Sequence, residues 1–199
     1  MLGEVAPGLA SLPRMTIGGT GVMVLGALVA GGLAVLLALA LRARLGAATS
    51  IAVAGLLWSL TAIALVTLVP TRPDVGVVPA ETRSESCSWD YGGPSGTTFE
   101  VLGLDQRMLN VLLFVPAGVF LVLAAGRWWS GLALAPVGLA LLAAYSLGIE
   151  VTQLQLARLD RACDVTDLVD NVLGAGIGAA IGVVLLPVVR PWRDRRTAE

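Results

Sequence analysis

The chain contains five apolar stretches that are each long enough to cross a membrane as a helix. A transmembrane helix needs about 20 consecutive apolar residues, because the hydrocarbon core of a bilayer is about 30 Å thick. The stretches are residues 17–41, 50–69, 109–125, 129–148 and 168–189. Only 14% of the residues are charged, whereas soluble domains average about 25%. The sequence therefore predicts an all-α fold, a polytopic membrane bundle of five transmembrane helices.

The arginines favour one orientation of these helices. An odd number of spans places the termini on opposite sides, and basic residues concentrate in short cytoplasmic connections. The dense run RPWRDRR directly follows the last span, whereas the arginines of the other side are accompanied by acids in a long connection. We therefore expect the N-terminus outside and the C-terminus inside. The expected parts are an extracytoplasmic segment 1–16, a membrane domain 17–190 with an extracytoplasmic loop at 70–108, and a basic cytoplasmic tail 191–199.

The residue types that are missing exclude several functions. The chain has no histidine, so histidine-based zinc sites, Ser-His-Asp triads and haem ligation by histidine are ruled out. A net charge of −1 without a basic stripe gives no support for a nucleic-acid partner. The absence of lysine, together with the excess of Ala, Leu, Val and Gly, is typical of a GC-rich bacterial genome. We therefore expect a multi-pass protein of a bacterial cell membrane.

The two cysteines fall in the two connections that the orientation places outside. Cys87 lies in the long loop, and Cys163 lies in the short loop 157–167. Disulfides persist in oxidising, extracytoplasmic settings. The pattern therefore leaves two alternatives open, a bridge between Cys87 and Cys163 or two free thiols.

Polar side chains recur where three predicted spans reach the outer face. They are Asn110 at the start of the third, Glu150 and Gln153 at the end of the fourth, and Asp164, Asp167, Asp170 and Asn171 at the start of the fifth. One explanation is structural: Asp164 caps the last helix, and Asp167 interacts favourably with the positive end of its dipole. That explanation does not cover Glu150, which lies near a helix C-terminus. Ionisable residues in a span mark function by default, so we expect a polar pocket, with Arg158 or Arg161 as the counter-charge.

Glycines continue the polar stripe of the last span into the membrane. Gly174, Gly178 and Gly182 are spaced by four residues, a pattern that lets helices approach closely in lipid. We expect them to pack the fifth span against a neighbour, so that its polar stripe faces that of the fourth span.

Four segments together resemble the VanZ-like family, which is named for a teicoplanin-resistance protein. They are TLVP at the end of the second span, NVLLFVPAGVF, SLGIEVTQ and RACDVTDLVDNVLGAGIG, in the order of the family. The resemblance implies a membrane protein of several helices whose polar signature includes Asn110, Glu150, Gln153, Arg161, Asp164, Asp167 and Asn171. It also implies a contribution to resistance against glycopeptides, without supplying the mechanism.

Three functions fit such a pocket. In the first, Asn110, Gln153, Arg161 and Asn171 bind a lipid-linked envelope component or a lipidated antibiotic at the outer leaflet, and the glycine-lined groove accepts its acyl chain. In the second, the protein is an enzyme acting on a lipid-linked cell-wall precursor, with Glu150, Asp164 and Asp167 as acid–base residues or as oxygen ligands of Mg²⁺, Mn²⁺ or Ca²⁺. In the third, the cluster is a structural brace. Membrane lipids are expected partners in each case.

Overall fold

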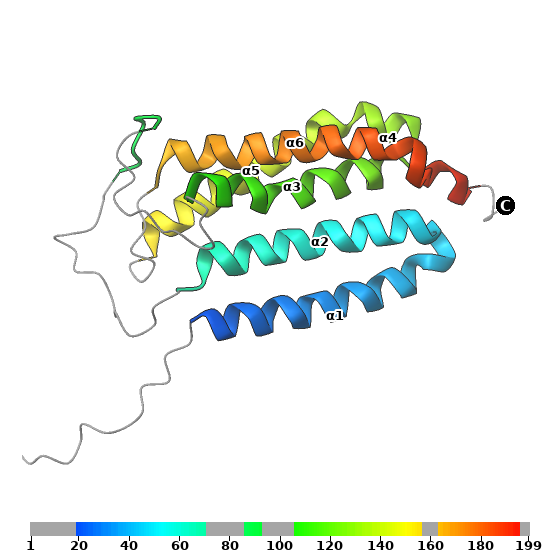
Figure 1. The fold of residues 1–199 in the computed structure, drawn as a ribbon, viewed down its shortest axis with the longest axis horizontal. Coiled ribbons are helices and arrows are strands. Elements are labelled where there is room, and N and C mark those ends of the chain that lie inside the picture. Colours follow the sequence, from blue (N-terminus) through cyan, green and yellow to red (C-terminus); the bar gives the residue numbers. More distant parts are fainter. Residues whose placement is uncertain (1–18, 71–85, 93–105, 157–162, 196–199) are drawn as a thin grey trace, which may run out of the picture.

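Five long helices, each long and apolar enough to cross a membrane, make up most of the described structure (Figure 1). The structure is a computed structural model that describes residues 19–70, 86–92, 106–156 and 163–195. The long helices are α1 (Thr20–Leu45), α2 (Ala47–Leu68), α3 (Gln106–Ala125), α5 (Ala135–Gln155) and α6 (Val165–Val189). The predicted all-α bundle with five spans is therefore confirmed. The predicted segment 1–16 and most of the loop 70–108 lie outside the described residues.

The fourth span differs most from its prediction, which was one helix over residues 129–148. The structure has a short helix α4 (Trp129–Ala133) and then α5, which runs seven residues further than expected, to Gln155. Pro136 occupies the first turn of α5, where its missing N–H costs nothing and its fixed φ suits a helix start. A proline also has no N–H to donate to the carbonyl four residues earlier, at Leu132, and its ring clashes with that carbonyl, so the helix breaks at Leu134. As a result, Glu150 lies inside α5 rather than at its end.

The last span starts earlier than predicted and ends at the predicted residue, Val189. It begins at Val165, three residues earlier than expected, with Asp164 as its N-cap. Beyond Val189 the chain forms a 3₁₀ helix, η2 (Pro191–Arg195), which packs against α2. The expected cytoplasmic tail therefore begins as part of the fold, with Pro191 fully buried.

Helices α3 and α6 form the centre of the bundle. They pack against each other more extensively than any other pair in the described structure, while α2 and α5 lie against them. The buried apolar side chains at this centre include Ile63, Phe114, Leu142 and Ile149. Helix α1 packs mainly against α2 and buries none of its residues, so its apolar surface is available to lipid.

The helix ends gather at two opposite ends of the bundle (Figure 1), and the two ends differ in the residues they carry. One end, called the polar end below, holds the C-terminal turns of α2 and α5 and the first turns of α3 and α6. The opposite end holds the α1–α2 turn at Gly46, α4 and η2. There the buried Arg127 donates hydrogen bonds to the carbonyl oxygens of Leu45 and Arg44. These carbonyls belong to the last turn of α1, which lacks partners within its own helix.

Candidate functional site

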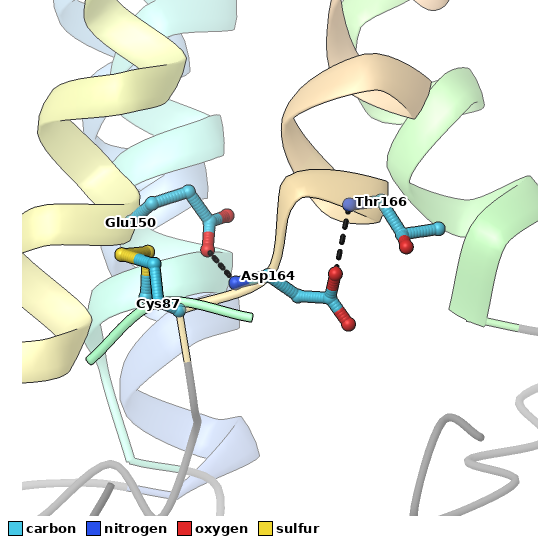
Figure 2. The surroundings of a disulfide bond; sticks show 5 residues. Cys87, Glu150, Asp164 and Thr166 are labelled. Carbon is cyan, nitrogen blue, oxygen red and sulfur yellow. Dashed lines mark hydrogen bonds between the residues drawn. A yellow bond between two sulfur atoms is a disulfide. The ribbon is translucent and has the colours of Figure 1, made fainter. Parts of the chain in front are cut away.

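The start of α6 contacts both α5 and the long loop at the polar end. Asp164 is its N-cap, because the Asp164 carboxylate accepts a hydrogen bond from the backbone N–H of Thr166 at 2.8 Å. The same residue's backbone N–H donates to Oε2 of Glu150 at 3.2 Å (Figure 2). The prediction that Asp164 caps the last helix is confirmed. The structure also brings Glu150 to Asp164, through the backbone of Asp164 rather than its carboxylate.

A disulfide between Cys87 and Cys163 ties the long loop to this helix start (Figure 2). Of the two alternatives that the sequence left open, the structure therefore has the bridge. Around it, Ser88 N–H donates to the Cys163 carbonyl at 2.8 Å, and Val165 N–H donates to the Ser88 carbonyl at 3.0 Å. These two bonds form an isolated parallel bridge between Ser88 and Asp164.

An arginine–aspartate pair lies at the α3–α6 contact. Arg107 in the first turn of α3 donates to both carboxylate oxygens of Asp170, from Nε at 2.9 Å and from Nη2 at 3.0 Å. The Asp170 side chain is 3% exposed, whereas that of Arg107 is 42% exposed. This two-point geometry is the strong form of an arginine–carboxylate contact. A buried carboxylate is therefore neutralised by a guanidinium that remains accessible from outside.

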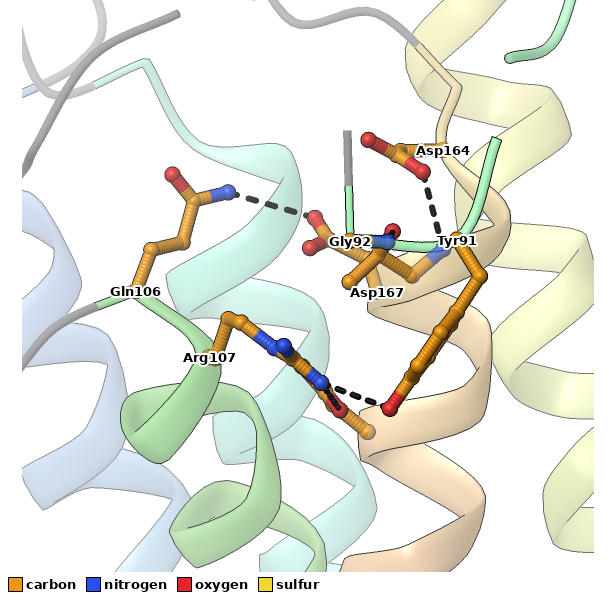
Figure 3. Close-up of polar contacts among 8 residues, drawn as sticks. Tyr91, Gly92, Gln106, Arg107, Asp164 and Asp167 are labelled. Atoms are coloured by element: carbon orange, nitrogen blue, oxygen red, sulfur yellow. Dashed lines mark hydrogen bonds and ion pairs between the residues drawn. The ribbon is translucent and has the colours of Figure 1, made fainter. Parts of the chain in front are cut away.

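Two further contacts surround this pair (Figure 3). Nη2 of Arg107 also donates to the hydroxyl of Tyr91 at 2.6 Å, and the guanidinium lies 5.1 Å from the Tyr91 ring centroid. One turn before Asp170, the Asp167 carboxylate accepts a hydrogen bond from Nε2 of Gln106 at 3.2 Å. Both acids of α6 are thus bound to the first two residues of α3.

Amides and a hydroxyl extend the polar contacts into the bundle. Asn171 donates from Nδ2 to Oγ of Ser146 at 2.9 Å, which joins α6 to α5. Gln153 donates from Nε2 to the Thr67 carbonyl of α2 at 3.0 Å. Glu150, Gln153, Ser146 and Asn171 are all buried. Such groups are costly to bury without partners, and these bonds account for part of their hydrogen-bonding capacity.

Two buried polar atoms at this end have no hydrogen-bond partner among the residues that the structure describes. They are Nδ2 of Asn110, on α3, and Oδ1 of Asn171, on α6. One is a donor and the other an acceptor. A bound acceptor would satisfy the first atom, and a bound donor would satisfy the second.

The sequence of the chain matches a known protein family. A family model described as VanZ/LLP1 matches residues 56–186, which is most of the chain. The chain belongs to the VanZ-like family. Neither the curated proteins nor the solved structures contain a match. The contacts of α3, α5 and α6 given above all fall within the matched residues, whereas α1 lies outside them.

The predicted site residues of this VanZ-like protein fall into three groups. The first group meets at the polar end: Glu150 with Asp164, Asn171 with α5, and Asp167 with α3. The second group points elsewhere, since Gln153 binds α2 and Asn110 has its Nδ2 unpartnered. The third group, Arg158 and Arg161, lies outside the described residues, so their expected role as counter-charge is not observed.

The carboxylates of the predicted cation site, Glu150, Asp164 and Asp167, are not grouped in the part of the chain that the structure describes, and cation binding stays a prediction. Among the residues that the structure describes, no three His, Cys, Asp or Glu side chains are grouped so that they could hold a metal ion. The physical reason is that the three carboxylates face different partners. Glu150 accepts from the backbone of Asp164, Asp164 caps its own helix, and Asp167 accepts from Gln106.

The glycine stripe of α6 faces a different helix than expected. A Cβ on Gly174 would lie 2.1 Å from the Val111 carbonyl oxygen, and one on Gly178 would lie 2.0 Å from that of Val115. Both carbonyls belong to α3, whereas the fourth span was expected at this position. The expectation that a glycine-lined groove accepts an acyl chain is therefore wrong, because the backbone of α3 fills that space.

Sequence reasoning missed the residues that surround the Arg107–Asp170 pair. The sequence pattern singles out none of Tyr91, Gln106 and Arg107. The sequence did contain an indication for Arg107. It lies three residues before Asn110, and residues three apart share one side of a helix. No local signal indicates Tyr91, because its contact with Arg107 depends on the fold of the loop.

Proposed function

We propose that this multi-pass VanZ-like protein protects the bacterial cell envelope against glycopeptide antibiotics of the teicoplanin type. In this proposal the polar end lies at the outer leaflet of the cell membrane. It binds a lipid-linked envelope component or the lipidated antibiotic itself. The observation that carries the proposal is the accessible Arg107–Asp170 pair above buried amides that retain hydrogen-bonding capacity.

The disulfide supports the outward orientation. Cys87 and Cys163 are bonded at the polar end, and disulfides persist outside the cytoplasm but are rare within it. The arginine distribution in the sequence favours the same orientation. The polar end would then face the compartment in which glycopeptides act on cell-wall precursors.

The surroundings of the pair suit an amphiphilic ligand. Polar groups of the ligand could bind the accessible guanidinium, Asp167 and the unpartnered amide atoms of Asn110 and Asn171. Just below the pair, α6 exposes Val169, Val172 and Leu173. An acyl chain would lie along this exposed apolar surface, since the glycine face is occupied by α3.

The test is antibiotic susceptibility in a bacterium that lacks a related protein. Expression of the wild-type chain should raise the minimal inhibitory concentration of teicoplanin. Glu150→Gln and Asp167→Asn should reduce that gain, because each replaces a carboxylate with a neutral amide, and a hydrogen bond to a charged group contributes about 1.5–3 kcal/mol, or roughly tenfold or more in affinity. Val184→Ala, a change at an exposed position near the other end of α6, should keep the gain.

Mass spectrometry of molecules that co-purify with the protein identifies the bound class. A retained lipid-linked headgroup supports binding of an envelope component, and retained teicoplanin supports binding of the drug. The resistance proposal fails if the wild-type chain is present in the membrane and leaves susceptibility at the level of the empty vector. The site proposal fails if both acid variants match wild type in susceptibility and thermal stability.

No specific observation favours the enzyme alternative. General acid–base chemistry needs two groups directed at one reacting centre, and the described contacts of Glu150, Asp164 and Asp167 point to three separate partners. We therefore base the proposed function on binding.

A further inference from the structure

Residues 86–92, called the strap below, are fixed to the start of α6 at several points. The Cys87–Cys163 disulfide and the two backbone hydrogen bonds of Ser88 hold its first half. At its other end, Gly92 N–H donates to Oγ1 of the buried Thr166 at 3.1 Å. The position of the strap along the membrane normal is therefore set by the first turn of α6.

That position can be compared with the layers of a bilayer. Ser88 pairs with Asp164, and Val169 is the first exposed apolar residue of α6 beyond it. Five residues of helix correspond to about 7.5 Å. A bilayer of about 40–45 Å with a hydrocarbon core of about 30 Å has a headgroup layer of roughly 5–8 Å on each side. If hydrocarbon begins at Val169, the strap lies at the depth of the lipid headgroups.

The side chains between the anchor points suit this layer. Trp89 is 78% exposed and Tyr91 is 57% exposed. Large aromatic side chains so exposed to water are unfavourable, but Trp and Tyr concentrate at membrane interfaces, where an apolar ring and a polar group are both accommodated. Because the backbone is already fixed, placing these rings there costs little additional ordering.

We propose that the strap is a membrane-interface anchor whose partner is the lipid headgroup layer, contacted by Trp89 and Tyr91. This inference goes beyond the proposed function, since it requires neither a bound antibiotic nor resistance. It has one consequence for the site. The Tyr91 hydroxyl binds Arg107, so an anchored strap holds the guanidinium at headgroup depth, and a ligand reaches the Arg107–Asp170 pair from within that layer.

Tryptophan fluorescence of the whole protein in phosphatidylcholine vesicles tests the anchor. The signal of Trp89 is the difference between wild type and Trp89→Phe, a change that keeps an aromatic ring. We expect this difference spectrum to be blue-shifted relative to tryptophan in water. It should lose most of its intensity when the lipid is brominated near the headgroup end of its acyl chains, and little when iodide is added.

A second difference spectrum, for Trp58, serves as a reference for depth in the bilayer. Trp58 lies in the middle of α2, with its indole N–H bonded to the Ala27 carbonyl of α1. The Trp58→Phe difference should be quenched more by lipids brominated near the chain end. In the Cys87→Ser, Cys163→Ser double variant, iodide should quench Trp89 more than in the wild type, because the strap has lost its covalent attachment.

The opposite pattern would overturn the proposal. If the Trp89 difference is red-shifted, quenched by iodide and insensitive to brominated lipid, the strap projects into water, where a soluble partner would be its occupant. The vesicles contain no antibiotic or cell-wall precursor. Failure of the anchor is therefore distinguishable from failure of the proposed function, which is read from susceptibility.

Discussion

At the residue scale, the Arg107–Asp170 pair is the strongest polar contact of the site. The carboxylate of Asp170 is almost fully buried and is bound at two points by a guanidinium that is partly exposed. A buried ion pair adds little net stability, but removal of one partner leaves an uncompensated buried charge. The two residues should therefore behave as a unit.

Arg107→Gln is predicted to destabilise the protein, because Asp170 then loses its counter-charge. Asp170→Asn in the same chain should recover much of the lost stability, since no buried charge remains. The measurement is the midpoint of thermal unfolding in detergent for both single variants and the double variant, arranged as a double-mutant cycle. Additive effects of the two single changes would contradict the coupling.

At the element scale, close packing between α3 and α6 positions the polar residues. Gly118 of α3 and Gly174 and Gly178 of α6 each lie against backbone atoms of the other helix. Backbone cannot move aside as a flexible side chain can. The same contact sets Gln106 and Arg107 opposite Asp167 and Asp170, so a change in helix separation should disturb the polar end.

Gly178→Ala tests this contact, and Gly176→Ala is its matched control. A Cβ at position 178 would lie 2.0 Å from the Val115 carbonyl oxygen, whereas one at position 176 has no neighbour within 4 Å. We expect Gly178→Ala to lower the free energy of unfolding by about 1–3 kcal/mol or more. Gly176→Ala should be neutral or slightly stabilising. The two positions are two residues apart, and chemical denaturation of the two purified variants provides the comparison. Equal free energies of unfolding would refute the role of the contact.

At the scale of the whole molecule, five helices of membrane length place chemically different groups at opposite ends. The polar end has the disulfide, the buried acids and the strap, and the opposite end has the buried Arg127 together with Arg42 and Arg44 of the last turn of α1. Since α6 is 25 residues long, it extends about 37 Å, enough to join the two membrane faces. The disulfide end and the arginine end should therefore face different compartments.

Reporter fusions test this orientation. We expect a C-terminal green fluorescent protein to fluoresce and a C-terminal alkaline phosphatase to be inactive, since the arginine-rich C-terminus should be cytoplasmic. Alkaline phosphatase inserted in the loop near Ser88 should be active. Cys87 and Cys163 should resist alkylation until a reductant is added. Active phosphatase at the C-terminus would reverse the orientation and remove the argument for an outer-leaflet site.

Much of the fold could be predicted from the sequence because apolar length is a local property. Four of the five spans began or ended within a few residues of the expected positions, and the cap at Asp164 followed from its place before an apolar run. The fourth span was predicted too early, because the effect of Pro136 on the helix break was not considered. That error placed Glu150 at a helix end, although it is buried inside α5 and 3% exposed.

The site was less predictable, because its contacts join distant parts of the chain. Arg107 and Asp170 are 63 residues apart, and nothing in either local sequence selects the other. The glycine pattern of α6 indicated close packing but not the partner, since small residues fit any neighbouring helix. The cysteines were compatible with a bridge, and only the position of the loop on α6 brought them together.

The sequence by itself determined that this is an all-α membrane protein of the VanZ-like family, with polar groups at the ends of three helices. Apolar run length, capping residues and motif order are properties of the chain alone. Only the tertiary structure decided which polar groups bind one another, which helix fills the glycine face, and that three carboxylates do not share a centre. The physical reason is that these outcomes depend on how the helices pack against one another. The packing energy is shared among residues that are far apart in the sequence.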